Sequence, residues 1–333
     1  MALSQTIGDR TYTYSHSVGS NQSCSAPTDL VLDSAGAVYT VSRGSEPGGL
    51  NGPRWTKWNL EDDDRIFDAS SQGSGDGQLL WPNSLALDEY GNVYITDEYL
   101  NRVSIFSSTG TFLSKWGESG KGQGQLDGPT GMRFDSVGNL LIAESRNNRV
   151  QKFTKEGKFL AQWGHGGSEP GELDMPLGIY VDSQDNVYVA DWGNSRVQKF
   201  TLDGKLLVQF GSPGSSTGQL SNPTGVAVDK DGDVYVTDWG NNRVQVYDAK
   251  GEFITSFYGD AREPSKSAAR FLAANPDYVK ARKRADTREE WGFRRPTAVA
   301  VDDQNKILVI ESISGRIQLY QKEENYSDPQ FNL

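Results

Sequence analysis

The chain has 333 residues, and its 33 Lys+Arg and 44 Asp+Glu residues give a net charge of −11. A protein that grips nucleic acid along a broad face usually has the opposite sign, so we do not expect a nucleic-acid partner. The single cysteine and the two histidines exclude an intramolecular disulfide, a cysteine-rich zinc site and a metal site built on several histidines.

The start of the chain lacks the apolar core of a secretion signal, and no apolar run approaches the roughly 20 residues that span a bilayer. We therefore expect a cytoplasmic protein that is not inserted into a membrane. The many glycine, tyrosine and tryptophan residues favour a fold with many turns and aromatic-rich strands.

Four segments of similar sequence begin at prolines that lie 47 residues apart: Pro82, Pro129, Pro176 and Pro223. The last of these segments reads PTGVAVDKDGDVYVTDWGNNRVQVY. Two looser copies begin at Pro27 and Pro296, so the chain contains six copies. An internal repeat of this length indicates a fold built from repeated structural units.

Each copy reads as four short strands, most clearly in the copy that begins at Pro223. The first strand covers 226–228, a turn with an Asp-x-x-Gly pattern follows, and further strands cover 234–237, 243–247 and 253–257. One such unit cannot bury both faces of its own sheet, so the copies must stack around an axis. The sequence therefore predicts an all-β fold, a six-bladed β-propeller that forms a single domain over 1–333.

The last copy stops after its third strand, which ends near Tyr320. The segment 11–18 at the start of the chain resembles the fourth strand of the other copies. We expect this segment to be the outer strand of blade six, where it closes the ring and removes a free strand edge. We expect the protein to be a monomer.

Two insertions interrupt the repeat, one at about 43–53 in blade one and one at about 260–295 between blades five and six. In the second insertion, Ser265 or Ser267 can cap a short helix, and Asp277 can cap another. This insertion holds ten Lys+Arg and six Asp+Glu residues, so it is basic within an acidic protein. We expect both insertions at one end of the axis, with the helical one as a lid over the entrance or as a docking arm.

The repeated pattern P-x-G-x-x-x-D-x-x-G-x-V-Y-V-x-D-x-x-N-x-R-V resembles the NHL repeat, and the match extends over about 11–322. The resemblance implies a six-bladed β-propeller of the NHL type. Members of this and of neighbouring propeller families include interaction modules, RNA-binding domains, extracellular sensors, lyases and lactone hydrolases. The resemblance is therefore specific for the fold and does not select a function.

Two polar positions are filled in every copy, and we interpret both as structural. One is an aspartate in the turn after the first strand, at Asp33, Asp88, Asp135, Asp182, Asp229 and Asp302. The other is an arginine at the start of the third strand, at Arg54, Arg102, Arg149, Arg196, Arg243 and Arg316. We expect each arginine to pair with the acidic residue that ends the second strand, except in blade one, which has Ser42 there. Function is then sought where the repeat is broken.

Residues that depart from the repeat near the axis are the candidates for a functional site. The candidate catalytic residues are Arg43, Glu98, Glu144, Arg146, Arg133 and Tyr180. The candidate ligand-binding residues are Asn83, Tyr99, Trp192, Trp239 and Trp291. Because Arg133 and Tyr180 occupy the same position in adjacent blades, we expect them to contact each other, as a functional pair or as packing.

No cofactor is required by this sequence and no zinc is expected. The lactone-hydrolase propellers that the chain resembles hold Ca²⁺ near the axis, and the oxygen ligands that this chain offers there are Asp29, Asn83, Glu98 and Glu144. The first function hypothesis is a ligand-binding or interaction propeller that holds a small molecule or a peptide at the axial entrance. The alternative is a lyase or hydrolase that acts on a small molecule with the acidic and arginine residues of blades one to three.

Overall fold

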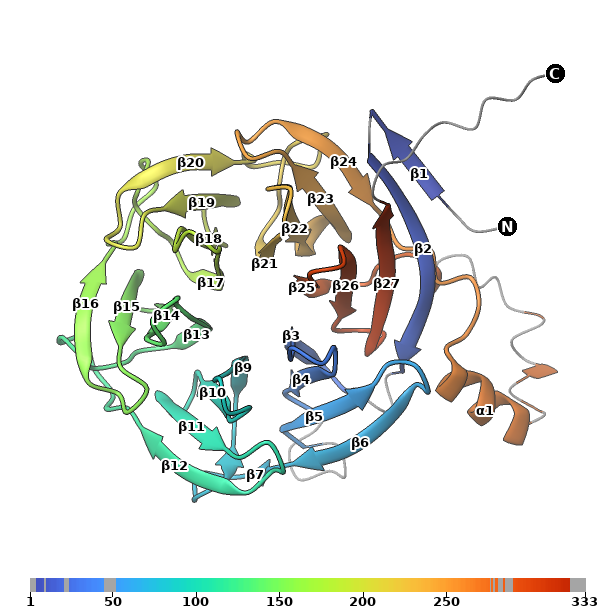
Figure 1. The fold of residues 1–333 in the computed structure, drawn as a ribbon, viewed down its shortest axis with the longest axis horizontal. Helices are drawn as coiled ribbons and strands as arrows, with labels where there is room; N and C mark the ends of the chain where they lie inside the picture. Colours follow the sequence, from blue (N-terminus) through green and yellow to red (C-terminus); the bar gives the residue numbers. More distant parts are fainter. Residues whose placement is uncertain are drawn as a thin grey trace.

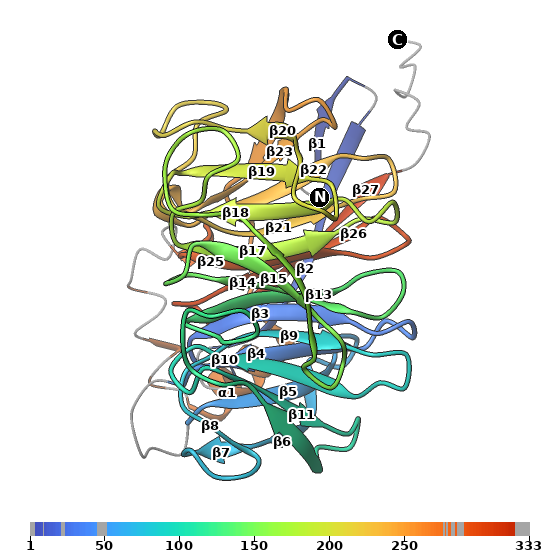
Figure 2. The ribbon, with the colours of Figure 1, turned by 90° about the vertical axis from the view of Figure 1, so that its left-hand side faces the viewer.

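The computed structural model describes residues 4–8, 10–20, 24–44, 52–275, 277, 279–280, 284 and 290–323. Six antiparallel blades surround a central axis, with the inner strand of each blade beside the axis and the outer strands on the perimeter (Figure 1). The strands run across the ring from one end of the axis to the other (Figure 2). The predicted six-bladed β-propeller with four-stranded blades is confirmed.

The first three blades each contain four consecutive strands. Blade one contains β3 (Pro27–Leu32), β4 (Val38–Ser42), β5 (Arg54–Asn59) and β6 (Asp64–Ala69). Blade two contains β9 (Pro82–Leu87), β10 (Val93–Asp97), β11 (Arg102–Phe106) and β12 (Phe112–Trp116). Blade three contains β13 (Pro129–Phe134), β14 (Leu140–Glu144), β15 (Arg149–Phe153) and β16 (Phe159–Trp163). Between blades one and two lies a short parallel pair, β7 (Ser71–Gln72) and β8 (Gln78–Leu79).

Blades four and five repeat this arrangement, and blade six differs from it. Blade four contains β17 (Pro176–Val181), β18 (Val187–Asp191), β19 (Arg196–Phe200) and β20 (Leu206–Phe210). Blade five contains β21 (Pro223–Val228), β22 (Val234–Asp238), β23 (Arg243–Tyr247) and β24 (Phe253–Phe257), with a 3₁₀ turn, η1 (Trp239–Asn241), after β22. Blade six contains β25 (Pro296–Val301), β26 (Lys306–Glu311) and β27 (Arg316–Glu323), and its sheet continues into strands from the start of the chain.

The sheet of blade six is completed by β2 (Arg10–Gly19), which pairs antiparallel with β27. The register places Val18 opposite Ile317 and Tyr12 opposite Lys322. Outside β2 lies β1 (Ser4–Ile7), so blade six has five strands. The segment 11–18 therefore lies within β2, the fourth strand of this blade, and β1 adds a strand outside it.

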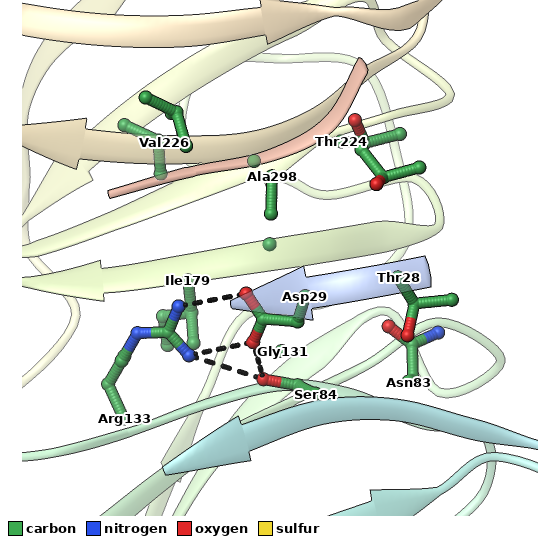
Figure 3. Close-up of a pocket in the computed structure, with 14 residues that line it drawn as sticks. Thr28, Asp29, Asn83, Ser84, Gly131, Arg133, Ile179, Thr224, Val226 and Ala298 are labelled. Carbon is green, nitrogen blue, oxygen red and sulfur yellow. Dashed lines mark hydrogen bonds and ion pairs between the residues drawn. The ribbon is translucent and has the colours of Figure 1, made fainter. Parts of the chain in front are cut away.

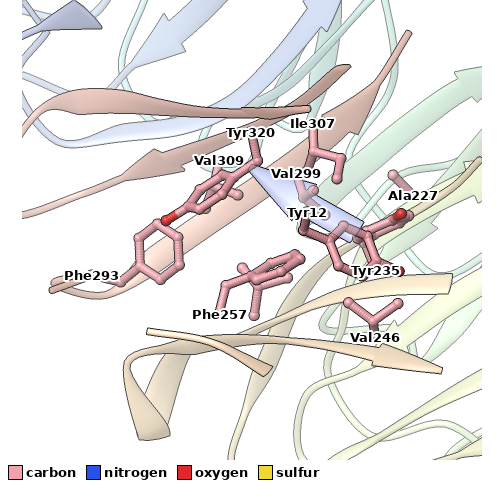
Figure 4. Packing of buried hydrophobic residues seen from close by; sticks show 11 residues of the cluster. Tyr12, Ala227, Tyr235, Val246, Phe257, Phe293, Val299, Ile307, Val309 and Tyr320 are labelled. Atoms are coloured by element: carbon pink, nitrogen blue, oxygen red, sulfur yellow. The ribbon is translucent and has the colours of Figure 1, made fainter. Parts of the chain in front are cut away.

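Apolar side chains fill the space between adjacent blades. The cluster between blades five and six includes Tyr12 from β2, together with Tyr235, Phe257 and Tyr320 (Figure 4). The rings of Tyr12 and Phe257 have centroids 5.0 Å apart, and those of Phe257 and Tyr320 are also 5.0 Å apart. Aromatic pairs at such distances add to the stability gained from burial. The first strands of the chain are thus anchored in the core and not only along a sheet edge.

Threonine hydroxyls join neighbouring inner strands close to where these strands begin. Thr130 Oγ1 lies 3.0 Å from the Ala143 carbonyl in its own blade and 2.9 Å from the Pro176 carbonyl in the next. Thr28 and Thr224 make the same link to the next blade. Thr297 Oγ1 donates to the Pro27 carbonyl at 3.1 Å, which joins blade six to blade one. The starts of adjacent inner strands are therefore neighbours, and we call this end of the axis the entrance.

The repeated arginines act within their own blades. Arg196 Nε donates to Asp191 at 2.8 Å, and its guanidinium also donates to the carbonyls of Ser168, Glu169 and Glu172. The same ion pair joins the arginine and the acid of the third, fifth and sixth blades. In blade two, Arg102 donates to three loop carbonyls instead. These contacts tie each incoming loop to its blade, which fits the structural interpretation of this position.

The helix α1 (Lys266–Ala274) lies outside the ring, beside β2 and blade one (Figure 1). Ser265 caps the helix and its hydroxyl donates to the Gly19 carbonyl at 2.9 Å, while the Ser267 N–H donates to Asp63 at 2.5 Å. The basic helix is held here because acidic residues of blade one face it, as in the 2.9 Å ion pair of Arg270 with Asp64.

The position of α1 overturns the expectation of a helical lid, since this helix packs on the perimeter and not over the axis. Most of the second predicted helix, after Asp277, and most of the insertion at about 43–53 lie outside the described residues.

An ionic cluster joins both ends of the chain to blade five. Lys322 Nζ lies 2.7 Å from Asp229, 2.7 Å from Asp231 and 2.9 Å from Asp233. Arg10 Nε lies 2.6 Å from Asp233. The side chain of Lys322 is 4% exposed, and those of Asp229 and Asp233 are 0% and 2% exposed. We call these five residues the closure latch, because they link β2, β27 and the first turn of blade five.

Replacing Lys322 with methionine should destabilise the protein by about 3–5 kcal/mol, because buried aspartates then lose their counter-ion. The free energy of unfolding can be measured by urea titration followed by tryptophan fluorescence. The control is Lys158→Met, at an exposed lysine, which should change stability by less than about 0.5 kcal/mol. An equal effect of both substitutions would show that the latch contributes nothing.

The latch should also make stability depend on pH. Burial raises the pKa of the Asp233 carboxyl, but Arg10 and Lys322 outweigh burial and hold this pKa below its ordinary value. A carboxyl with a lowered pKa stabilises the fold above its unfolded pKa of about 3.9, and this contribution is lost as the pH falls through the folded pKa. The unfolding free energy should therefore fall more steeply below about pH 4 in the wild type than in Asp233→Asn. Parallel curves would rule out this linkage.

Candidate functional site

A narrow polar pocket lies on the axis and opens at the entrance (Figure 3). Its empty volume is about 310 Å³, part of which is open solvent. Thr28, Asn83, Thr224 and Thr297, each at the second residue of an inner strand, line the entrance end of the pocket. Four of the six inner strands thus present polar side chains at the mouth of the axis.

The inner strands approach each other closely, which explains the glycine or alanine at the third position of the inner strands of blades three to six. A Cβ added to Gly131 would lie 2.4 Å from the Leu177 carbonyl oxygen, and one added to Gly178 would lie 2.4 Å from that of Thr224. Blades one and two carry Asp29 and Ser84 at this position instead of glycine or alanine. These two polar side chains therefore occupy space on the axis that the other blades leave to backbone.

An ion pair between half-buried Arg133 and buried Asp29 joins blades one and three at the axis (Figure 3). The two terminal nitrogens of Arg133 lie 3.0 and 3.2 Å from the two carboxylate oxygens of Asp29, and Ser84 Oγ donates to Asp29 at 2.5 Å. Arg133 also donates to the carbonyls of Leu85 and Met132. Paired charges of this kind persist in an interior only when their hydrogen bonds are satisfied, and here they are. We call Asp29, Ser84 and Arg133 the axial floor.

Arg133 and Tyr180 were predicted to contact each other, but in the structure each hydrogen-bonds to a different partner. The guanidinium points at Asp29, and the Tyr180 hydroxyl donates to the Val228 carbonyl at 3.0 Å in the next blade. Burial raises the pKa of Tyr180, so its phenol stays neutral. The reason for the difference is that Asp29 supplies a charge at a position that the other blades fill with small residues.

Five residues meet at the entrance between blades one, two and three. Arg43 lies 2.9 Å from Glu98 and its guanidinium lies 4.6 Å from the ring centroid of Trp81. Asn83 donates to the Glu98 carboxylate at 3.2 Å, and Arg146 lies 3.7 Å from the other oxygen of that carboxylate. We call these residues the entrance cluster. The structure therefore brings together four of the residues predicted from the sequence, Arg43, Asn83, Glu98 and Arg146.

The entrance cluster combines half-buried charges with accessible aromatic surface. Burial lowers the pKa of Arg43, and the neighbouring Glu98 carboxylate opposes this shift. Trp81 is 48% exposed, Tyr99 is 68% exposed, and the Arg146 side chain is 47% exposed. This arrangement offers flat apolar faces, donors and an acceptor to a molecule at the entrance.

The remaining predicted site residues lie outside the entrance cluster. Glu144 is fully buried, where it accepts hydrogen bonds from Arg149 and other side chains of blade three. Trp192 and Trp239 follow the second strands of blades four and five, and Arg295 lies 3.8 Å from the ring centroid of Trp239. The Trp291 carbonyl lies beside Arg316 at the end of the second insertion, and Trp291 does not line the axial pocket.

The carboxylates that could bind Ca²⁺ are already matched with arginines. Asp29 pairs with Arg133, Glu98 with Arg43, and Glu144 with Arg149. Within the described ranges, no three His, Cys, Asp or Glu side chains are grouped so as to hold a metal ion. An arginine beside each carboxylate opposes the binding of a further cation, so the geometry does not favour these oxygens as a calcium site.

The two histidines lie away from the axial pocket. His16 is on β2 at the perimeter, and His165 is in the loop between β16 and β17, where Nε2 lies 3.2 Å from Glu172. Ser84 of the axial floor was not among the residues predicted from the sequence. Its signal was a serine at a position that three later copies fill with glycine.

Comparisons with known proteins agree with this architecture. A family model described as the NHL repeat matches residues 173–200 and 220–247. The chain carries NHL repeats. Protein lin-41 from Caenorhabditis elegans is 42% identical over 50 residues, which are 15% of this chain and 4% of that protein. This chain therefore spans only a small part of the length of protein lin-41, and the likeness does not extend to the whole of that protein.

Several solved structures share the propeller fold. A protein of unknown function from Bacteroides thetaiotaomicron has a TM-score of 0.62 and 17% identity, over 94% of this chain and 76% of that one. Virginiamycin B lyase from Staphylococcus aureus, solved as a catalytically inactive variant with quinupristin, has a TM-score of 0.53 and 15% identity, over 96% and 98%. A streptogramin B lyase has a TM-score of 0.57 and 12% identity, over 96% and 100%. Identities this low show a common fold.

A helix long and apolar enough to span a bilayer is not found in the described part of the chain.

The axial floor can be tested by a double-mutant cycle with Asp29→Ala and Arg133→Ala. Each substitution introduces the residue that other blades carry at that position, as in Ala298 and Ala227. Each single variant should lose about 3 kcal/mol of unfolding free energy, because one buried charge is left unpaired. The double variant should lose less than the sum, with a coupling of about 1–3 kcal/mol. Simple additivity in urea titrations would show that the pair does not act as a unit.

Proposed function

We propose that this NHL propeller is a binding protein that holds a peptide or a small molecule at its entrance. The observation that carries the proposal is the entrance cluster, in which Arg43, Glu98 and Arg146 form a charged network beside exposed Trp81. Exposed tryptophan, tyrosine and arginine side chains are typical of the residues that supply most of the energy at binding sites.

The geometry favours a ligand that lies across the entrance. The axis is narrow because the inner strands approach closely, and the axial floor fills its interior. A ligand would therefore rest on the mouth and contact the faces of Trp81 and Tyr99. Arg146 would offer it hydrogen-bond donors, and the Glu98 carboxylate would offer an acceptor. Neither a cofactor nor Ca²⁺ is needed for such binding.

The alternative function is a lyase or hydrolase, and the lyase structures that share this fold are its support. The solved virginiamycin B lyase variant is catalytically inactive and has an alanine in place of a histidine. In the present chain, His16 is on the perimeter and His165 is in a loop away from the axial pocket. The arrangement of ionisable groups at the entrance, in which Glu98 and Asp127 pair with arginines, supports binding more than proton transfer.

A selection experiment tests the binding function. Random 12-residue peptides displayed on phage are panned against the immobilised protein, and enriched peptides are synthesised with a fluorescent label. Their affinities, measured by fluorescence anisotropy, should fall at least about tenfold in Trp81→Ala and in Arg146→Ala, since each removes an exposed contact at the entrance.

The matched control is Tyr90→Ala, which removes a still more exposed aromatic residue from the turn between β9 and β10, at the opposite end of the blade. This variant should bind the selected peptides as the wild type does. Failure to enrich any peptide, or equal binding by Trp81→Ala and the wild type, would contradict the proposal.

A further inference from the structure

The residue before the proline of each repeat lies at the entrance, where the inner strand begins. In five of the six blades this residue has a left-handed backbone, with φ between 49° and 64°; the five are Ala26, Gly128, Met175, Asn222 and Arg295. The fold imposes this conformation. In blade six, for example, the Arg295 N–H donates to Asn242 Oδ1 at 2.9 Å and the Arg295 carbonyl accepts from the Ser312 N–H at 3.0 Å.

Glycine and asparagine adopt a left-handed backbone at little cost, and two blades have them there. Met175 and Arg295 are long side chains at the same position, where they strain the backbone. Neither residue recovers this cost by burial, because Met175 is 45% exposed and Arg295 is also exposed. Arg295 stacks on Trp239, and within the described ranges its guanidinium has no ion pair with a carboxylate. Both side chains are thus displayed at the entrance against the preference of the backbone.

A second position around the entrance is also glycine in some blades and a larger residue in others. It is the second residue after β10 and its equivalents, and blades four and five carry Gly193 and Gly240 there. A Cβ on Gly193 would lie 2.2 Å from Asp174 Oδ2, and one on Gly240 would lie 2.4 Å from Ser221 Oγ. Blade one also has a glycine there, Gly44, whereas blades two, three and six carry exposed side chains, namely Tyr99, Arg146 and Ile313.

The two positions together surround the entrance with apolar surface and cations. The apolar part consists of Trp81, Tyr99, Met175 and Ile313, all at least 41% exposed. The cations are Arg146 and Arg295, one on each side of the axis, in blades three and six. Arginine binds carboxylates through paired hydrogen bonds, and flat or thioether side chains receive apolar groups.

We infer that the entrance binds an acidic peptide in which glutamate or aspartate alternates with apolar residues. This inference rests on the proposed binding function and specifies its ligand. A single-stranded nucleic acid would also offer negative charge and flat bases. It is disfavoured because it carries a negative charge at every nucleotide, whereas Arg146 and Arg295 lie on opposite sides of the axis, among Glu98, Asp127 and Asp174.

Three labelled probes of equal length test the ligand class by fluorescence anisotropy. They are a 12-residue peptide that alternates Glu with Leu and Trp, the same peptide with Gln in place of Glu, and a 12-nucleotide oligouridylate. The acidic peptide should bind at least tenfold more tightly than the Gln peptide, and its affinity should fall as NaCl rises from about 50 to 300 mM. Equal binding of the two peptides, or tighter binding of the oligouridylate, would overturn the inference.

Variants at the strained position separate a ligand contact from a structural role. Arg295→Asn and Met175→Asn should raise the melting temperature, because asparagine tolerates the left-handed backbone, and should weaken acidic-peptide binding at least about fivefold. Ala26→Gly is the matched control, since it relieves the same strain without removing a long side chain, and it should raise the melting temperature with unchanged affinity. Lower melting temperatures in both Asn variants, together with unchanged affinity, would assign these side chains to the fold.

Failure of this inference can be told from failure of the proposed function. If phage-selected peptides bind through Trp81 and Arg146 but show no excess of acidic residues and bind Arg295→Asn equally well, the ligand class is wrong and the entrance site stands. If no peptide binds at all, the proposed function itself is contradicted.

Discussion

The structure depends on closing a ring with the two ends of one chain. Blade six draws β2 from the start of the chain and β25 to β27 from its other end, and no other blade combines distant segments. The hydrogen bond from Thr297 to the Pro27 carbonyl completes the circle at the axis, and the closure latch completes it at the perimeter. The entrance takes its shape from this closure, because every inner strand is held in place by the one before it.

Where a charged residue departs from the repeat, the opposite charge that pairs with it lies on another blade and not on its own. Asp29 replaces a small residue in blade one, and the arginine that neutralises it replaces an alanine in blade three. Asp233 replaces the asparagine that blades two to four carry after the first turn, and the cations that neutralise it come from β2 and β27. Each unusual charge is thus matched by a partner on another blade, as buried charges require.

Sequence periodicity predicted much of the fold and part of the site. The 47-residue spacing predicted the number of blades and their strands, since each copy needs neighbours to bury its sheet. Arg43, Glu98 and Arg146 were found because they break the pattern beside the axis. The partner of Arg133 and the place of α1 were not predictable in this way. A repeat fixes where a residue lies in its blade, but contacts between blades depend on which side chains happen to face each other.

The pairing of β2 with β27 has a consequence for the order of events during synthesis. The paired residues are separated by about 300 positions, as for Tyr12 and Lys322. Blades one to five are each built from a continuous segment and can form while the ribosome is still at work. The first strand of the ring, by contrast, must wait for the last one to emerge, and joining them requires closure of a loop that spans nearly the whole protein. The entrance is therefore not complete until β27 has been synthesised and has paired with β2.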